Sequence, residues 1–255
     1  MSRAGRAYVA VTYVFLYLPL LVLGINSVNA SRFGTRWDGF TLSWYSRIAD
    51  SPQLVDAALN SLGVAAASAT LATLLGTLGA MALYRCRSRG RQALHGLLLI
   101  VVMSPDIVLG ISLLVLFIVL HLTLGFVSLL LAHITFCLPF VAVTVYSRLA
   151  GFDPRILEAA RDLGASEWRT ALEVVLPLAA PAVAAGWLLS LTLSLDDVIV
   201  SFFVTGPTFD ILPLRIYSMV RLGVKPEVNA LAVILFVVPL TLVTLAHLLL
   251  KEEPR

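Results

Sequence analysis

Three aspartates fall inside long apolar stretches of the sequence, and they are the residues whose chemistry stands out first. Asp106 interrupts one stretch, and Asp196 and Asp197 stand side by side in another. A carboxylate near the centre of a membrane costs roughly 2.5–3.5 kcal/mol on insertion scales. A sequence keeps such residues where they face a polar path or a partner, so these acids predict a route for positively charged solutes.

Serines accompany the paired acids at helical spacing. Ser190, Ser194, Asp197 and Ser201 follow one another at intervals of four, three and four residues, which places them on one face of a helix. A stripe of hydroxyls and a carboxylate is suited to line a wet passage. Because adjacent residues do not share a helix face, Asp196 and Asp197 should have different neighbours.

The apolar stretches contain no lysine or arginine that could neutralise the acids. The missing positive charge could come from a partner subunit or from a cargo. Trp44 could offer a ring face to an entering cation, or it could anchor the chain at a membrane surface. Two further alternatives stay open: Asp106 could cap a helix kinked at Pro105, and Asp196 or Asp197 could serve only as a hydrogen-bonding group between helices.

Residues 147–177 form a polar segment with a second set of informative residues. Asp153 can cap a helix that begins at Pro154, and Gly164 can end that helix in a left-handed turn. Ser166 can cap a second short helix, which must stop before Pro177. We call this helix–glycine–helix unit the elbow.

The surface of the elbow suits contact with another protein. Ala159 and Ala160 offer a small apolar face, next to Glu158 and among charges that alternate in sign. Such a face can dock into a groove of a partner. Glu167 could be a helix-start acid favoured by the helix dipole, or it could contact that partner.

Six apolar stretches must position all of these residues. Hydrophobic residues make up 59% of the 255 residues and charged residues 13%, and the mean hydropathy is +0.94. A typical soluble domain has about 45–50% apolar and about 25% charged residues. This composition excludes an ordinary soluble enzyme, a disordered chain and a nucleic-acid-binding domain. Because a bilayer core needs about 20 apolar residues in a helix, we predict one all-α membrane domain over 1–255 with six transmembrane helices. They are expected at residues 8–26, 60–84, 94–120, 125–146, 178–204 and 228–250.

Positive charges indicate the orientation. With six spans and the N-terminus inside, the inner segments hold twelve arginines and lysines and the outer segments hold six. Arg85, Arg87, Arg89 and Arg91 form the strongest inner cluster. The bias predicts that both termini are cytoplasmic. Residues 3–30 also resemble a secretory signal peptide, but their apolar run exceeds the usual 7–15 residues, so we expect an uncleaved helix.

The elbow carries the motif on which a family resemblance rests. Glu158-Ala159-Ala160, three residues, Gly164, nine residues, Val174, one residue and Leu176-Pro177 resemble the EAA signature of membrane subunits of bacterial ABC importers. That signature usually has isoleucine at the position of Val174. Residues 104–109, 194–198, 204–214 and 225–231 further resemble the PotC-type permeases for spermidine and putrescine.

The resemblance implies a type I (MetI-like) permease fold in a bacterial inner membrane. It implies a heterodimer with a PotB-type permease, two copies of a PotA-type ATPase that bind ATP and Mg, and a PotD-type periplasmic polyamine-binding protein. The elbow would be the coupling helix seated in the ATPase, through Glu158, Ala159, Ala160, Gly164, Glu167 and Pro177. The substrate pathway would run past Asp106, Ser190, Ser194, Asp196, Asp197, Ser201 and Trp44, since a linear polyamine brings two or three ammonium groups to the acids.

Absent motifs limit the chemistry of the chain itself. The sequence has no Gly-x4-Gly-Lys-Ser/Thr loop, so it should not hydrolyse ATP, and its four histidines are isolated, so we expect no metal site. An ABC importer permease for another cationic or small solute is the alternative function. A proton-coupled transporter is disfavoured by the elbow. An intramembrane aspartyl protease is disfavoured because adjacent aspartates on one helix cannot face each other.

Overall fold

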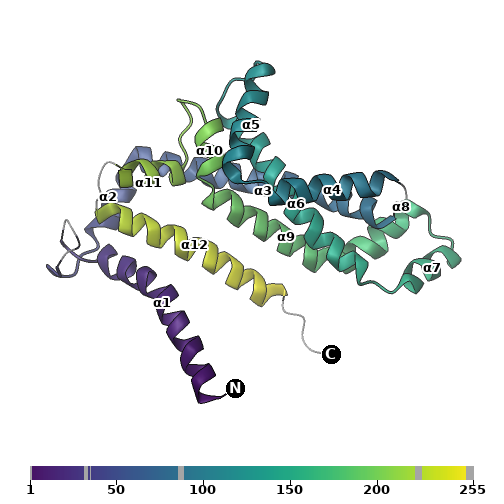
Figure 1. The fold of residues 1–255 in the computed structure, drawn as a ribbon, viewed down its shortest axis with the longest axis horizontal. Coiled ribbons are helices and arrows are strands. Elements are labelled where there is room, and N and C mark those ends of the chain that lie inside the picture. The colour runs from purple at the N-terminus through teal and green to yellow at the C-terminus, as the bar shows by residue number, and fades with distance from the viewer. Residues whose placement is uncertain (1, 32–33, 35, 86–88, 222–225, 251–255) are drawn as a thin grey trace. The chain divides into compact units, whose positions relative to one another are not determined.

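The computed structural model of the chain describes residues 2–31, 34, 36–85, 89–221 and 226–250. Within these residues the chain is helical and has no strand, apart from an isolated bridge between Asn29 and Phe40 (Figure 1). Arg87 of the predicted inner cluster lies outside the described residues. The chain divides into two compact units, residues 1–58 with 214–255 and residues 59–213, and each is described by itself.

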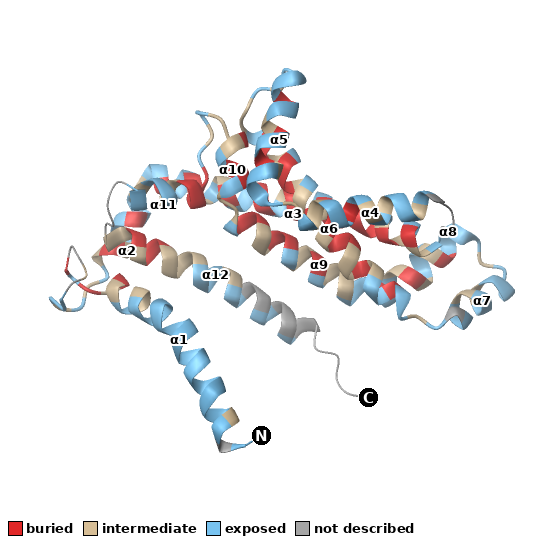
Figure 2. Cartoon of the chain, viewed as in Figure 1, coloured by how far each residue is buried: buried red, intermediate tan, exposed pale blue. Residues whose placement is uncertain are grey.

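The first unit contains α1 (Arg3–Ser27), α2 (Ser43–Ala49), most of α11 (Leu212–Arg221) and α12 (Pro226–Leu250). Helices α1 and α2 both pack against α12. Figure 2 shows that α1 is exposed along almost its whole length although it is strongly apolar. An exposed apolar helix of this length is typical of a membrane span that faces lipid.

The second unit contains α3 (Pro52–Arg85) from residue 59 onward, together with α4 (Arg89–Met103), α5 (Asp106–Val119), α6 (Phe126–Ala150), α9 (Leu176–Asp196) and α10 (Ile199–Val204). Helix α6 packs along α9, and α3 joins them through buried alanines, valines and leucines. Figure 2 shows the buried residues gathered on these helices and on α10.

Two glycines allow α3, α6 and α9 to approach closely. A Cβ atom on Gly76 of α3 would lie 2.8 Å from the Cβ of Val141 on α6, and one on Gly186 of α9 would lie 3.2 Å from a Val141 methyl group. Small residues commonly bring membrane helices together in this way. Val141 is therefore held between the two neighbouring helices.

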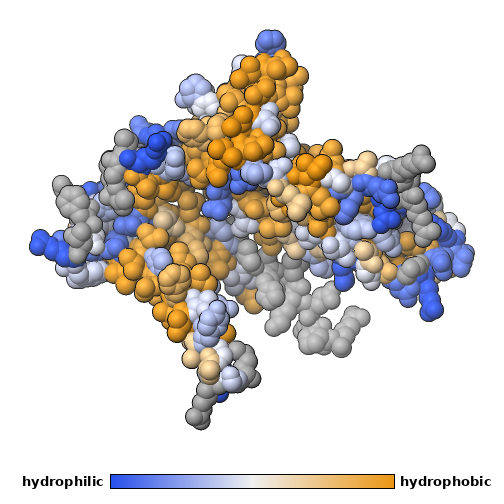
Figure 3. Space-filling model, viewed as in Figure 1, coloured by the Kyte–Doolittle hydropathy of each residue, from blue (hydrophilic) through white to orange (hydrophobic). Residues whose placement is uncertain are grey.

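The elbow belongs to the second unit and consists of α7 (Pro154–Asp162), α8 (Glu167–Thr170) and a π-helical turn, Ala171–Val175, that continues into α9. Figure 3 shows hydrophilic side chains around α7, whereas the surface over α5 is apolar. The elbow is thus the polar end of an otherwise apolar bundle.

The prediction of an all-helical, multi-pass membrane protein is confirmed. Among the described residues, four helices are long and apolar enough to cross a membrane, and the bent pair α4–α5 would make a fifth span. Helix α12 adds a shorter apolar stretch, Pro226–Thr241. Six separate spans and cytoplasmic termini stay predictions.

Two predicted continuous spans are broken, which corrects the sequence analysis. The stretch 94–120 bends by 111° between α4 and α5, because Pro105 has no N–H and disfavours helical geometry at the residue before it. The stretch 178–204 breaks between α9 and α10, where Asp197 is extended with φ −69° and ψ 125°. Both breaks fall beside the predicted acids.

Candidate functional site

Asp106 lies directly after the first break, as the first residue of α5. Pro105 precedes it as the helix cap, so Asp106 does not itself cap the helix with a side-chain hydrogen bond. A carboxylate in the first turn is favoured by the helix dipole. The Asp106 side chain is exposed and has no hydrogen bond or ion pair with the residues that the structure describes.

Asp197 lies at the second break and accepts hydrogen bonds from the start of α10. Its carboxylate accepts from the N–H of Val200 at 3.2 Å, from the N–H of Ser201 at 2.7 Å and from the hydroxyl of Ser201 at 2.7 Å. The side chain is only 9% exposed. Asp197 therefore pairs backbone groups that the helix break would otherwise leave unpaired.

His133 of α6 joins the same cluster. Its Nδ1 lies 2.6 Å from the hydroxyl of Ser194, and its Nε2 lies 2.9 Å from the hydroxyl of Ser201 and 3.6 Å from Asp197 Oδ2. Ser68 of α3 donates to Ser194 at 3.1 Å. Side chains from four helices thus meet at the second break.

The serines of the predicted stripe face this cluster and the interior of the helix bundle. Ser190, Ser194 and Ser201 are 0%, 4% and 0% exposed. In this conformation the three hydroxyls line no open passage, because they pack against α6 and α3 instead. Their role along a substrate path stays a prediction.

Asp196 differs from its neighbour in surroundings, as the sequence predicted. It ends α9, its side chain is exposed, and no described residue forms a hydrogen bond or ion pair with it. Asp197, in contrast, has the interhelical contact that the sequence analysis left open as an alternative. At this break, therefore, one acid is exposed and unpaired among the described residues, and the other is hydrogen-bonded between helices.

Trp44 of α2 is buried rather than open to a passage. Its indole N–H donates to the carbonyl of Asn29 at 2.8 Å, and the Arg47 guanidinium lies over its ring at 4.8 Å from the centroid. Only 4% of the residue is exposed. In this conformation Arg47 occupies a ring face, and the contact of Trp44 with a cargo stays a prediction.

The first half of the elbow has the expected geometry. The Asp153 carboxylate accepts from the Arg155 N–H at 3.0 Å at the start of α7, and Gly164 ends the turn after α7 with φ +77°. Glu158 and Ala159 are exposed on α7, and Ala160 is half-buried. The helix–glycine–helix geometry predicted from the spacing is present.

The second half of the elbow corrects the prediction at Pro177. The short helix does not stop before this proline, because α8 passes through the π-helical turn directly into α9. Proline would clash with the carbonyl four residues earlier in a regular helix, and a π-turn is one way of relieving that clash. The second half of the elbow, α8 with the π-helical turn, is consequently continuous with α9.

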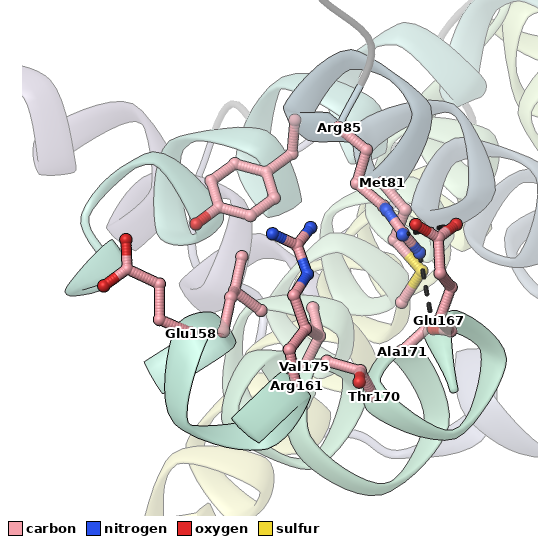
Figure 4. A pocket seen from close by; sticks show the side chains of 10 residues that line it. Met81, Arg85, Glu158, Arg161, Glu167, Thr170, Ala171 and Val175 are labelled. Carbon is pink, nitrogen blue, oxygen red and sulfur yellow. Dashed lines mark hydrogen bonds and ion pairs between the residues drawn. The ribbon is translucent and has the colours of Figure 1, made fainter. Parts of the chain in front are cut away.

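Glu167 and Arg85 tie the elbow to the end of α3. Arg85 Nη2 lies 2.7 Å from Glu167 Oε2, and its Nη1 donates to the Glu167 carbonyl at 3.3 Å (Figure 4). A cavity of about 660 Å³ lies beside this pair, and Figure 4 shows Arg161 of α7 pointing into it. Glu167 is thus both a first-turn acid of α8 and the partner of an arginine on another helix.

Three residues that the structure singles out were not predicted from the sequence. His133 was taken as isolated, although it contacts Ser194 and Ser201, two members of the predicted serine stripe that lie on either side of the second break. Leu163 and Trp168 lie on the elbow and are 88% and 70% exposed. Large exposed apolar side chains in a polar segment indicate a docking surface, and these two are visible in the sequence of the elbow.

Known proteins share both the sequence and the fold of this chain. Residues 72–251 match the family model described as "Binding-protein-dependent transport system inner membrane component". The chain is 58% identical over 255 residues to "Spermidine/putrescine transport system permease protein PotC" of Escherichia coli (strain K12), covering 100% of this chain and 96% of that protein. It is 41% identical over 230 residues to "Putrescine transport system permease protein PotI" of the same strain, covering 88% and 82%.

A solved structure supports the fold independently of sequence. A chain of a bacterial ABC transporter involved in the import of the acidic polysaccharide alginate matches with a TM-score of 0.76, over 98% of this chain and 96% of that chain. The two sequences are 15% identical, so the similarity concerns the fold alone.

Proposed function

Since the chain belongs to the family of binding-protein-dependent transport system inner membrane components, we propose that it is the membrane subunit of an ATP-driven ABC importer that carries polyamines into the cell. The observation that carries the proposal is 58% identity along the whole chain to a spermidine/putrescine permease. The family resemblance drawn from the elbow motif is confirmed. Its relatives are transport subunits rather than enzymes.

The two exposed acids give the cargo preference a physical basis. Asp106 and Asp196 each lie at a helix break, where polar backbone groups accompany the carboxylate. Broken helices at membrane depth are tolerated where they are buried in protein or line a polar cavity. A polyamine that loses its water there would exchange it for carboxylate and carbonyl oxygens. The same carboxylates would repel anions.

The topology that we propose has six spans, with both termini in the cytoplasm of a bacterial cell and the chain in the inner membrane. Helices α4 and α5 would form one broken span, and α12 would form the sixth. The excess of arginine and lysine in the inner segments supports this orientation. The elbow then lies on the cytoplasmic side.

The assembly that we propose has four further components: a PotB-type permease, two copies of a PotA-type ATPase and a PotD-type periplasmic binding protein. The ATPases would bind ATP and Mg, and the exposed elbow residues Leu163 and Trp168 would dock into one of them. Because the elbow continues into α9, movement of the ATPase would reach the second break through one helix.

The second candidate function is import of another cationic or small solute by the same assembly. The acids alone do not distinguish a polyamine from another cation. Competition separates the two candidates: unlabelled spermidine or putrescine should suppress uptake of labelled spermidine, whereas amino acids and neutral solutes should not.

Reconstitution of the full complex in proteoliposomes tests the function. We expect ATP-dependent uptake of spermidine that falls about tenfold in Asp196→Asn, because one charged contact on the path is lost. Asp56→Asn is the matched control, since Asp56 is an exposed acid on α3 that belongs to the first unit and to neither break. Uptake without ATP, or equal inhibition by neutral solutes, would contradict the proposal.

A further inference from the structure

The cluster around the second break joins polar side chains of α3, α6, α9 and α10 in one hydrogen-bonded group. It contains Ser68 of α3, His133 of α6, Ser194 of α9, Ser201 of α10 and Asp197 between the last two helices. The serines and the histidine are buried. Neither the elbow motif nor the family match assigns a role to His133.

The hydrogen bonds of the cluster run in one direction. Ser201 donates its single hydroxyl hydrogen to Asp197, so it can only accept from His133, and His133 Nε2 must carry the hydrogen. In a neutral imidazole Nδ1 then accepts from Ser194. Ser194 in turn accepts from Ser68, whose hydroxyl is also within hydrogen-bond distance, at 3.2 Å, of a backbone carbonyl on its own helix. The chain of donors therefore ends on the Asp197 carboxylate, and each of its members is satisfied.

This chain of hydrogen bonds turns Asp197 inward. Its carboxylate accepts the two N–H groups at the start of α10 and the Ser201 hydroxyl, which His133 holds from α6. Asp196, one residue earlier, is exposed and has no partner among the described residues. Because these hydrogen bonds hold Asp197 and the start of α10 in place, they also fix the position of the adjacent residue Asp196.

We propose that His133 is a positioning residue: it holds Asp197 and α10 against α6, and so presents Asp196 as the carboxylate that this break offers to a cationic cargo. The inference rests on the proposed function for the identity of the cargo. It assigns different roles to two adjacent aspartates: Asp197 accepts the hydrogen bonds at the helix break, and Asp196 faces the passage. His133 acts through Asp196 and does not itself touch the cargo.

The ratio of spermidine uptake to putrescine uptake tests this role. Removing a cargo-facing charge should penalise the trivalent amine more than the divalent one, so Asp196→Asn should change the ratio severalfold. His133→Phe should lower uptake per assembled complex about tenfold and change the ratio in the same direction. Adding His133→Phe to Asp196→Asn should change the ratio no further, because both act on one contact.

A conservative variant separates positioning from mere packing. His133→Gln keeps an N–H donor for Ser201 and should retain most of the uptake and the wild-type ratio. His121→Asn removes an exposed imidazole outside the cluster and should change neither. If His133→Phe lowers uptake of both amines equally while Asp196→Asn changes the ratio, the positioning role is wrong.

Hydrogen–deuterium exchange of the assembled complex tests the same role without any cargo. We expect the amides of residues 198–204 to exchange faster in His133→Phe and at the wild-type rate in His133→Gln. Equal exchange in the wild type, His133→Phe and His133→Gln would overturn the positioning role, whichever solute the complex transports. Failure of the wild-type complex to transport polyamines, with exchange as expected, would overturn the proposed function alone.

Discussion

Two buried serines on α9 differ in the hydrogen bonding of their hydroxyl groups. Ser194 bonds to His133 and Ser68, whereas the Ser190 hydroxyl has no partner among the described residues. A buried hydroxyl without a partner has lost its hydrogen bonds to water and has gained none in the protein, which is destabilising. The same residue type, one helical turn apart, therefore separates the effect of the hydrogen bonds from that of burial.

We expect Ser194→Ala to lower the free energy of unfolding by about 1–2 kcal/mol, because it leaves His133 Nδ1 unpaired. Ser190→Ala should leave stability unchanged or raise it slightly. Thermal unfolding of the purified complex measures both. Equal destabilisation by the two substitutions would show that the hydrogen bonds of Ser194 are not what stabilises this part of α9.

At the residue scale, the sequence was sufficient to locate the acids and the serine stripe but not their partners. The stripe followed from helical spacing, and all three serines are buried, although the break at Asp197 places Ser201 on α10 rather than on α9. His133 is sixty or more residues away from Ser194 and Ser201, so only the packing of α6 on α9 brings them together. Contacts of that kind leave no local pattern in a single sequence.

Gly164 is the element-scale position at which the elbow depends on one backbone conformation. Its φ of +77° is costly for a residue with a Cβ atom, by about 1–2 kcal/mol, although no neighbouring atom would obstruct the side chain. We expect Gly164→Ala to lower ATP-driven uptake, and Gly164→Asn to lower it less, because asparagine tolerates this conformation better.

Gly151→Ala is the matched control for the elbow. Gly151 ends α6 with φ −88°, and an added Cβ would meet only ordinary contacts at 3.6 Å or more. Uptake per assembled complex should be unchanged in this variant. If Gly151→Ala and Gly164→Ala reduced uptake equally, the left-handed turn would not be the cause.

At the element scale, caps and turns were predictable and helix breaks were not. Asp153, Gly164 and Ser166 occupy the positions that their local chemistry requires. The break at Asp197 has no glycine or proline to mark it, and it arises where the side chain can satisfy the start of α10. Pro105 did mark the first break, but the apolar run on both sides favoured a continuous span. Conversely, Pro177 suggested a helix end that the π-turn avoids.

At the scale of the whole molecule, the exposed apolar side chains of the elbow predict how the subunit assembles. Trp168 is 70% exposed in a polar segment, and buried tryptophans at interfaces often contribute 2 kcal/mol or more, by order of magnitude. We expect Trp168→Ala to reduce co-purification of the ATPase about tenfold. Trp37→Ala, which alters an exposed tryptophan outside the elbow, should leave the ATPase bound. Loss of the ATPase from both variants, or from neither, would contradict docking through Trp168.

The composition was enough to establish a helical membrane protein, and the elbow motif was enough to indicate its family. Neither could reveal that acids, breaks and buried partners coincide, because that coincidence depends on how α3, α6, α9 and α10 pack. We propose that the exposed carboxylates at the two helix breaks receive a cation, while the elbow transmits movement of an ATPase along α9.

A structure of the assembled importer with spermidine trapped in its passage tests this account most directly. We expect an ammonium group within about 3 Å of the carboxylate of Asp196 or Asp106, the distance of a charge-assisted hydrogen bond. Asp197 should remain bonded to Ser201 beside His133, and the elbow should be seated on the ATPase. If Asp106 and Asp196 both faced lipid and spermidine bound elsewhere, the central claim would be wrong.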